Sequence, residues 1–159
     1  MVMAHRAKGY VPLLRDGAHM LSGIIVVQAE SPLKGLEELE GAQLAFPAPN
    51  AFGASLLIRA LLAEQHRIGF RPSYVKTHSN AYRQVARGEA AAAGGIRSTL
   101  EREPPDLRSR LRILFETPGF ASHPLAAHPS LAPKLSAQVV KAFSDLHASE
   151  EGRKQLAAI

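Results

Sequence analysis

Short apolar runs and amphipathic segments alternate along most of the chain. Four consecutive β-branched residues, 24–27, predict a buried strand that ends before a Ser-Pro pair. A second strand is expected over residues 43–46, closed by a proline-containing turn at 47–50. Leucines at helical spacing predict a short helix between the two strands, over residues 33–39. The first part of the chain is therefore expected to run strand, helix, strand.

The same alternation continues through the rest of the chain. Residues 53–65 place leucines and alanines at helical spacing, and the alanine run at 90–93, enclosed by glycines, fits a short buried strand. The other expected elements are a strand at 73–77, a helix capped by Ser79 that runs to Arg87 before Gly88, a strand at 111–115, a helix whose apolar face runs from Leu135 to Leu146, and a final helix from Ser149. This order predicts an α/β fold with a parallel sheet and right-handed crossovers.

Composition narrows the function classes. A chain of 159 residues is expected to form one main core, and the absence of cysteine excludes disulfides, thiolate metal sites and a cysteine nucleophile. The net charge of +5 is dispersed and only 6% of residues are aromatic, so no nucleic-acid partner is expected. Residues 1–10 lack the apolar core of a secretory signal, and no apolar run is long enough to cross a bilayer.

Two turns that lead directly into helices are the candidate binding loops. They span residues 50–55 and 78–80, and both are expected at the carboxyl ends of parallel strands, where such sheets bind ligands. Helix N-termini carry unpaired N–H groups and a partial positive charge, which suit a phosphate-like oxyanion. Two such termini could converge on one anion. The alternative is that Asn50 and Ser79 only cap their helices.

Catalytic motifs are incomplete. Gly53-Ala54-Ser55 is half of a nucleophile elbow, but Leu57 stands where the second glycine belongs. No Walker loop or dinucleotide fingerprint follows a predicted strand, and the seven histidines are scattered, which favours surface roles over a metal site. An enzyme acting on a phosphorylated substrate would have only His78 as a general base. The sequence therefore predicts no enzymatic activity, no metal and no cofactor.

The order of the segments resembles the substrate-binding proteins of phosphate, phosphite and phosphonate ABC transporters, which have the two-lobed type II periplasmic binding fold. The segments that carry the resemblance are residues 9–13, 22–32, 36–41, Gly53, 59–62, His78, 87–92 and 111–114. The resemblance implies transport: a periplasmic or lipid-anchored receptor closes its lobes on a tetrahedral oxyanion and delivers it to a permease in the membrane.

The resemblance also implies a division of the chain. Residues 1–30 match the remnant of a first lobe and its crossover strand, residues 31–116 the second α/β lobe, and residues 117–159 the return segment with the C-terminal helices. The leading part of the first lobe has no counterpart. We therefore expect exposed apolar surface, and either self-association or binding of the missing segment.

The family's site residues carry over with two departures. The hydroxyl-rich anion loop becomes Asn50-Ala51-Phe52 before Gly53, so backbone N–H groups would supply more of the contact. His78 matches the family's ligand-facing histidine, with Ser79 beside it. The acidic residue that the family places after its next strand should fall near residues 95–96, where the chain has Gly-Ile.

The predicted function is a solute-binding component of an ABC transporter for phosphate- or phosphonate-like oxyanions, truncated or degenerate in its first lobe. The ligand-binding residues are expected to be Asn50, Ala51, Phe52, Gly53, His78 and Ser79. The alternative is a cytoplasmic ligand-sensing domain of the same fold that regulates a partner.

Overall fold

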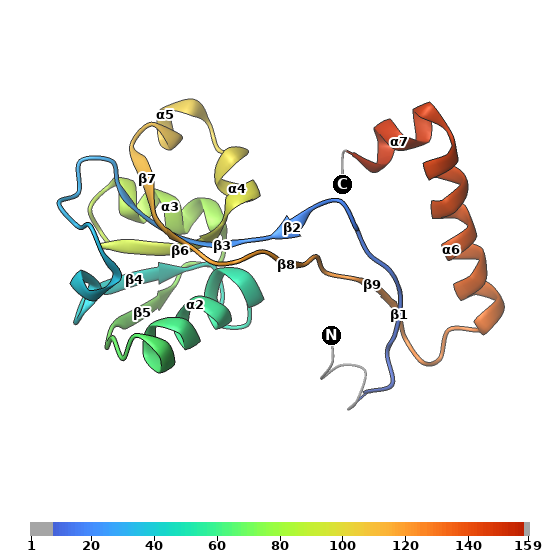
Figure 1. Ribbon diagram of the computed structural model, residues 1–159, viewed down its shortest axis with the longest axis horizontal. Coiled ribbons are helices and arrows are strands. Elements are labelled where there is room, and N and C mark those ends of the chain that lie inside the picture. Colours follow the sequence, from blue (N-terminus) through green and yellow to red (C-terminus); the bar gives the residue numbers. More distant parts are fainter. Residues whose placement is uncertain (1–7, 158–159) are drawn as a thin grey trace. The chain divides into compact units, whose positions relative to one another are not determined.

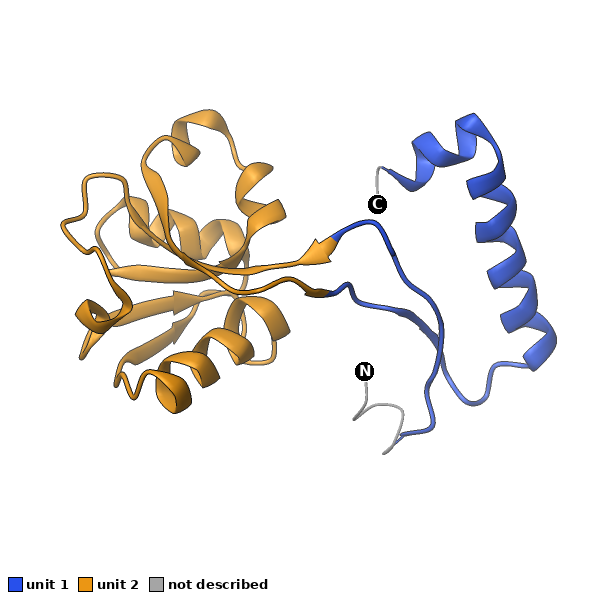
Figure 2. Ribbon diagram, in the orientation of Figure 1, with its two compact units in different colours: residues 1–19, 121–159 blue, residues 20–120 orange. Residues whose placement is uncertain are grey.

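The computed structural model describes residues 8–157, which divide into two compact units (Figure 2). Unit 2 comprises Met20–Phe120, and unit 1 comprises Met1–His19 together with Ala121–Ile159. The division into domains at residues 30 and 116 stays a prediction.

Unit 2 contains a five-stranded sheet in the order β5-β4-β6-β3-β7. The strands are β3 (Gly23–Gln28), β4 (Gln43–Phe46), β5 (Arg71–Tyr74), β6 (Ala92–Ile96) and β7 (Leu111–Glu116). β4 runs parallel to β5 and β6, whereas β3 is antiparallel to both β6 and β7. The predicted α/β class is confirmed, but the wholly parallel sheet is wrong. The chain enters unit 2 along β3 and leaves it along β7, so these neighbours must run in opposite senses.

Helices cover both faces of this sheet (Figure 1). α3 (His78–Ala86) and α5 (Pro105–Arg108) contribute to the core on one face, with Ile24 and Val26 of β3. The other face packs against a 3₁₀ turn, η1 (Leu36–Leu39), and against one continuous helix made of η2 (Phe52–Leu56), α2 (Leu57–Ala60) and η3 (Leu61–Gln65). Because Ile25 and Val27 point to that second face, all four β-branched residues are fully buried.

Most elements lie where the apolar pattern predicts them. β4 matches its predicted range residue for residue, and the helix predicted over 53–65 begins one residue earlier. Two predicted strands are displaced: β5 begins before the predicted range 73–77 and shares only its first two residues, and β6 begins two residues after the start of the alanine run. The helix predicted over 33–39 is only the short turn η1. α4 (Arg97–Glu101) and α5 were not predicted.

Unit 1 is built from β1 (Val11–Leu14), which pairs antiparallel with β9 (Leu125–Ala127), and from α6 (Pro133–Ala148) and α7 (Glu150–Leu156). At the unit boundary, β2 (Met20–Leu21) and β8 (Phe120–Ala121) form a second two-stranded ladder. Ser149 caps α7 by accepting a hydrogen bond from the Gly152 N–H, which confirms the predicted helix start. No side chain of α6 is fully buried, and Leu135 is 49% exposed. The predicted self-association stays a prediction.

Within residues 8–157, no helix is both long and apolar enough to span a membrane.

Candidate functional site

Three connections meet at the carboxyl edge of the sheet in unit 2. The parallel strands β4, β5 and β6 end there, and each leads into a helix: η2, α3 and α4 respectively. This edge is where sheets of this kind place their ligands.

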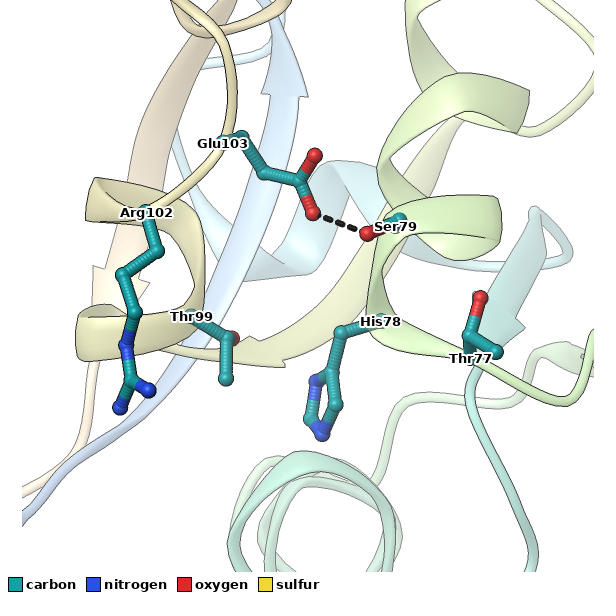
Figure 3. Close-up of a pocket in the computed structure, with 6 residues that line it drawn as sticks. All are labelled: Thr77, His78, Ser79, Thr99, Arg102 and Glu103. Carbon is teal, nitrogen blue, oxygen red and sulfur yellow. Dashed lines mark hydrogen bonds between the residues drawn. The ribbon is translucent and has the colours of Figure 1, made fainter. Parts of the chain in front are cut away.

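The N-terminus of α3 is capped by Thr77. The Thr77 side chain accepts a hydrogen bond from the Asn80 N–H at 3.1 Å, and the Asn80 amide donates to the Val75 carbonyl at 2.9 Å. The prediction that Ser79 caps this helix is therefore wrong, and its hydroxyl serves another purpose. It donates a hydrogen bond to the Glu103 carboxylate (Figure 3).

An open pocket of about 380 Å³ lies between the start of α3 on one side and α4 with the residues directly after it on the other (Figure 3). Its lining residues carry hydroxyl, imidazole, guanidinium and carboxylate groups: Thr77, His78, Ser79, Thr99, Arg102 and Glu103. Two of the six predicted ligand residues, His78 and Ser79, line this pocket. The other four lining residues were not predicted. Thr77 is the residue before α3, and Thr99, Arg102 and Glu103 lie on or directly after α4, the first helix after β6.

His78 enters the pocket from the first turn of α3. Its Nδ1 is buried and has no hydrogen-bond partner among the described residues. Burial lowers the pKa of the imidazole, and the Glu103 charge opposes this only in part. His78 is therefore a neutral side chain with one N–H donor at neutral pH.

We expect the pKa of His78 to lie below about 6.5, because burial disfavours its charged form. Glu103→Gln should lower this pKa further, since it removes the nearby carboxylate charge. As the pH falls below about 6.5, the unfolded chain binds the proton first, so the free energy of unfolding should decrease. NMR titration of the ring protons, with the urea-unfolded chain as reference, measures the shift. A pKa equal to that of the unfolded chain would contradict this assignment.

The end of β6 explains why no acid stands at residue 95. A Cβ on Gly95 would lie 2.2 Å from the Tyr82 hydroxyl oxygen, so that hydroxyl occupies the space. Tyr82 accepts a hydrogen bond from the Ile96 N–H at 3.2 Å, and its hydroxyl lies 2.8 Å from Thr99 Oγ1. Burial raises the pKa of Tyr82, which keeps the phenol neutral. The carboxylate that lines the pocket is instead Glu103.

The turn before Gly53 lies at the same edge, on the other face of β6. The Ala54 carbonyl oxygen would lie 2.1 Å from a Cβ on Gly94, whereas Tyr82 of α3 covers Gly95 on the opposite face. The residues of this turn, Asn50, Ala51, Phe52 and Gly53, do not line the pocket. The helix has no side-chain cap and begins after Ala51, so the alternative that Asn50 caps it is wrong. Phe52 is 44% exposed.

Arg59 holds this turn against β5. Its guanidinium donates hydrogen bonds to the Pro49 carbonyl at 3.2 Å and to the Tyr74 hydroxyl at 2.7 Å. The contacts of Gly94 and Gly95 show that the N-termini of α3 and of the helix that begins at Phe52 flank the end of β6 from opposite faces.

Comparison with protein families gives one match over the whole chain. The model of the family described as the periplasmic substrate-binding protein of the phosphonate ABC transporter matches residues 1–159. A comparison with curated protein sequences finds no match.

Several solved structures share the fold at low sequence identity. XAC2383 from Xanthomonas citri, bound to chloride ion, is 14% identical with a TM-score of 0.79 and aligns with 95% of this chain. PhnD1 from Prochlorococcus marinus, in complex with methylphosphonate, is 15% identical with a TM-score of 0.79 and aligns with 96% of this chain. A binding protein component of an ABC phosphonate transporter from Pseudomonas aeruginosa is 17% identical, with a TM-score of 0.75 and 93% of this chain aligned. The chain spans 61%, 64% and 53% of these three proteins respectively.

Proposed function

Because the chain belongs to the family of periplasmic substrate-binding proteins of phosphonate ABC transporters, we propose that it binds a phosphate- or phosphonate-like oxyanion. The family match over residues 1–159 is the observation that carries this proposal. This family is one of transporter binding proteins and not of enzymes, which agrees with a role in binding without turnover. The ligand would sit at the carboxyl edge of unit 2.

The pocket beside α3 supports this proposal chemically. The first-turn N–H groups of a helix have no intrahelical partner and attract negative charge. His78 adds one neutral donor and Arg102 a positive charge at the same pocket. These groups suit an anion that has several oxygen acceptors.

The family match also supports a proposal about localisation and partner. We propose that the protein works in the periplasm, secreted or anchored by a lipid, and delivers its ligand to an ABC permease. The residues at the turn 50–53 would contact the ligand from the second helix N-terminus.

The direct test is a thermal-shift and calorimetry panel of phosphate, phosphite, methylphosphonate and sulfate. A ligand at 100 times its Kd should stabilise the protein by about 2.7 kcal/mol. If none of the four oxyanions binds to the folded protein, the proposed function is wrong.

His78→Ala should weaken binding of the best anion in this panel by about 10- to 150-fold. This range corresponds to the loss of one hydrogen bond to a charged ligand, about 1.5–3 kcal/mol. His66→Ala is the matched control, because His66 is exposed and follows the far end of the helix that begins at Phe52. Calorimetric titration of both variants measures the effect. Equal affinity in wild type and His78→Ala would remove His78 from the site.

A further inference from the structure

We propose that Glu103 is a specificity-determining residue that competes with the ligand: its carboxylate accepts the hydrogen bond of the Ser79 hydroxyl, and a bound oxyanion must displace it. This inference rests on the proposed function, because it concerns the same pocket.

The position of Glu103 is that of an anion. Ser79 is the second residue of α3, after the Thr77 cap and His78, where a negative group is favoured by the free N–H groups of the helix end. The Glu103 side chain reaches this turn from the other wall of the pocket and accepts the hydrogen bond of the Ser79 hydroxyl (Figure 3). The pocket therefore contains an oxyanion that belongs to the protein itself.

This carboxylate is held without a cation. Among the described residues, Glu103 forms no ion pair, whereas Glu101 lies 3.7 Å from the Arg97 guanidinium and Glu116 is also paired with Arg97. A hydroxyl and a helix end are weaker partners than a guanidinium fork. An external phosphate, which has more acceptor oxygens and more charge, can replace such a contact.

The neighbouring Arg102 favours replacement of the Glu103 carboxylate by an external anion. Its side chain points away from Glu103 (Figure 3), and its Nε donates a hydrogen bond to the Ser98 carbonyl at 3.3 Å. The part of the chain that the structure describes offers Arg102 no ion pair. The pocket thus holds a carboxylate and a guanidinium that do not neutralise each other. An incoming anion would be attracted by the Arg102 guanidinium and would repel the Glu103 carboxylate.

Other roles for Glu103 predict a different change in ligand affinity when its charge is removed. A carboxylate that accepts a proton from the ligand would strengthen binding, so its removal would weaken affinity. A clamp that only fixes the segment after α4 would affect stability and leave affinity unchanged. A carboxylate that opposes the incoming anion gives tighter binding when its charge is removed, because like charges repel within a shared site. A competitor for the Ser79 hydroxyl also gives tighter binding when the side chain is shortened and its charge is kept.

The test is calorimetric titration of the full chain with phosphate and with methylphosphonate, at one pH and one low salt concentration. Glu103→Gln should bind about tenfold more tightly than wild type, since it keeps the shape and loses the charge. Glu101→Gln is the matched control: it removes the same charge from the same segment but does not line the pocket, so its affinity should change less than about twofold. Circular dichroism of each variant confirms that it is folded.

The outcomes separate this inference from the proposed function. If wild type binds and Glu103→Gln binds equally or more weakly, Glu103 is not a competitor and the proposed function stands. If no variant binds either anion, the competitor is wrong, and the proposed function is wrong as well if phosphite and sulfate also fail to bind. If Glu103→Gln fails to fold, Glu103→Asp replaces it: its shorter side chain withdraws from Ser79, so tighter binding supports the competitor and unchanged affinity overturns it.

Discussion

Gly94→Ala is expected to destabilise the protein by about 3 kcal/mol or more, because the new methyl group has no space on either side. Its Cβ would lie 2.1 Å from the Ala54 carbonyl oxygen and 2.6 Å from two ring atoms of Phe46. Ala54 and Phe46 are essentially fully buried, and the carbonyl belongs to a helix backbone, so neither neighbour can withdraw without moving the packed layer. Urea unfolding followed by far-ultraviolet circular dichroism measures the loss.

Gly17→Ala is the control for this substitution. A Cβ at Gly17 meets no heavy atom within 4 Å, so the same change should leave stability unaltered or raise it by up to about 1 kcal/mol. If Gly94→Ala proved as stable as Gly17→Ala, the close contact between β6 and the helix that begins at Phe52 would be wrong. The comparison bears on the site, since this contact holds one of the two helix N-termini at the carboxyl edge.

The apolar pattern predicts where the buried elements lie because their apolar side chains pack on the two faces of the sheet. β4 and the helix over 52–65 are recovered almost residue for residue, and the α6–α7 pair follows from helical spacing and the Ser149 cap. The pattern does not give strand direction. A continuous apolar run has no direction, so the four β-branched residues of β3 fit an antiparallel strand as well as a parallel one.

The candidate site is predicted less well, because its contacts are not local in sequence. His78 and Ser79 follow from a helix start after a strand, but Glu103 meets Ser79 from 24 residues away. The intervening charges and prolines have no apolar period, so α4 and α5 are not visible in the pattern. The cap was misassigned because Thr77 and Ser79 both carry hydroxyls. The extended backbone of Thr77 makes it the cap, and sequence alone does not show that conformation.

The family that the chain resembles has an acid at the position of residues 95–96, where this chain has Gly-Ile, and packing accounts for the difference. The Tyr82 hydroxyl fills that position and closes a ring of hydrogen bonds with Ile96 and Thr99. The Thr99 and Tyr82 hydroxyls donate to the Ile96 carbonyl at 2.7 and 3.1 Å and lie 2.8 Å from each other, while the Tyr82 hydroxyl accepts from the Ile96 N–H. The end of β6 and the start of α4 are therefore joined through α3.

Tyr82→Phe should lower the free energy of unfolding by about 1–3 kcal/mol, because it leaves the Ile96 N–H without its partner in a largely buried position. Tyr74→Phe is the control: Tyr74 is 42% exposed and its hydroxyl accepts a hydrogen bond from Arg59 at the surface, so the expected change in the free energy of unfolding is within about 0.5 kcal/mol.

A double-mutant cycle of Tyr82→Phe with Thr99→Val tests whether the hydrogen bonds form a closed ring. Each single change already breaks the ring, so the double variant should lose less than the sum of the two single losses. Additive losses would show that Tyr82 and Thr99 act independently, and the end of β6 would then not be held by a closed ring.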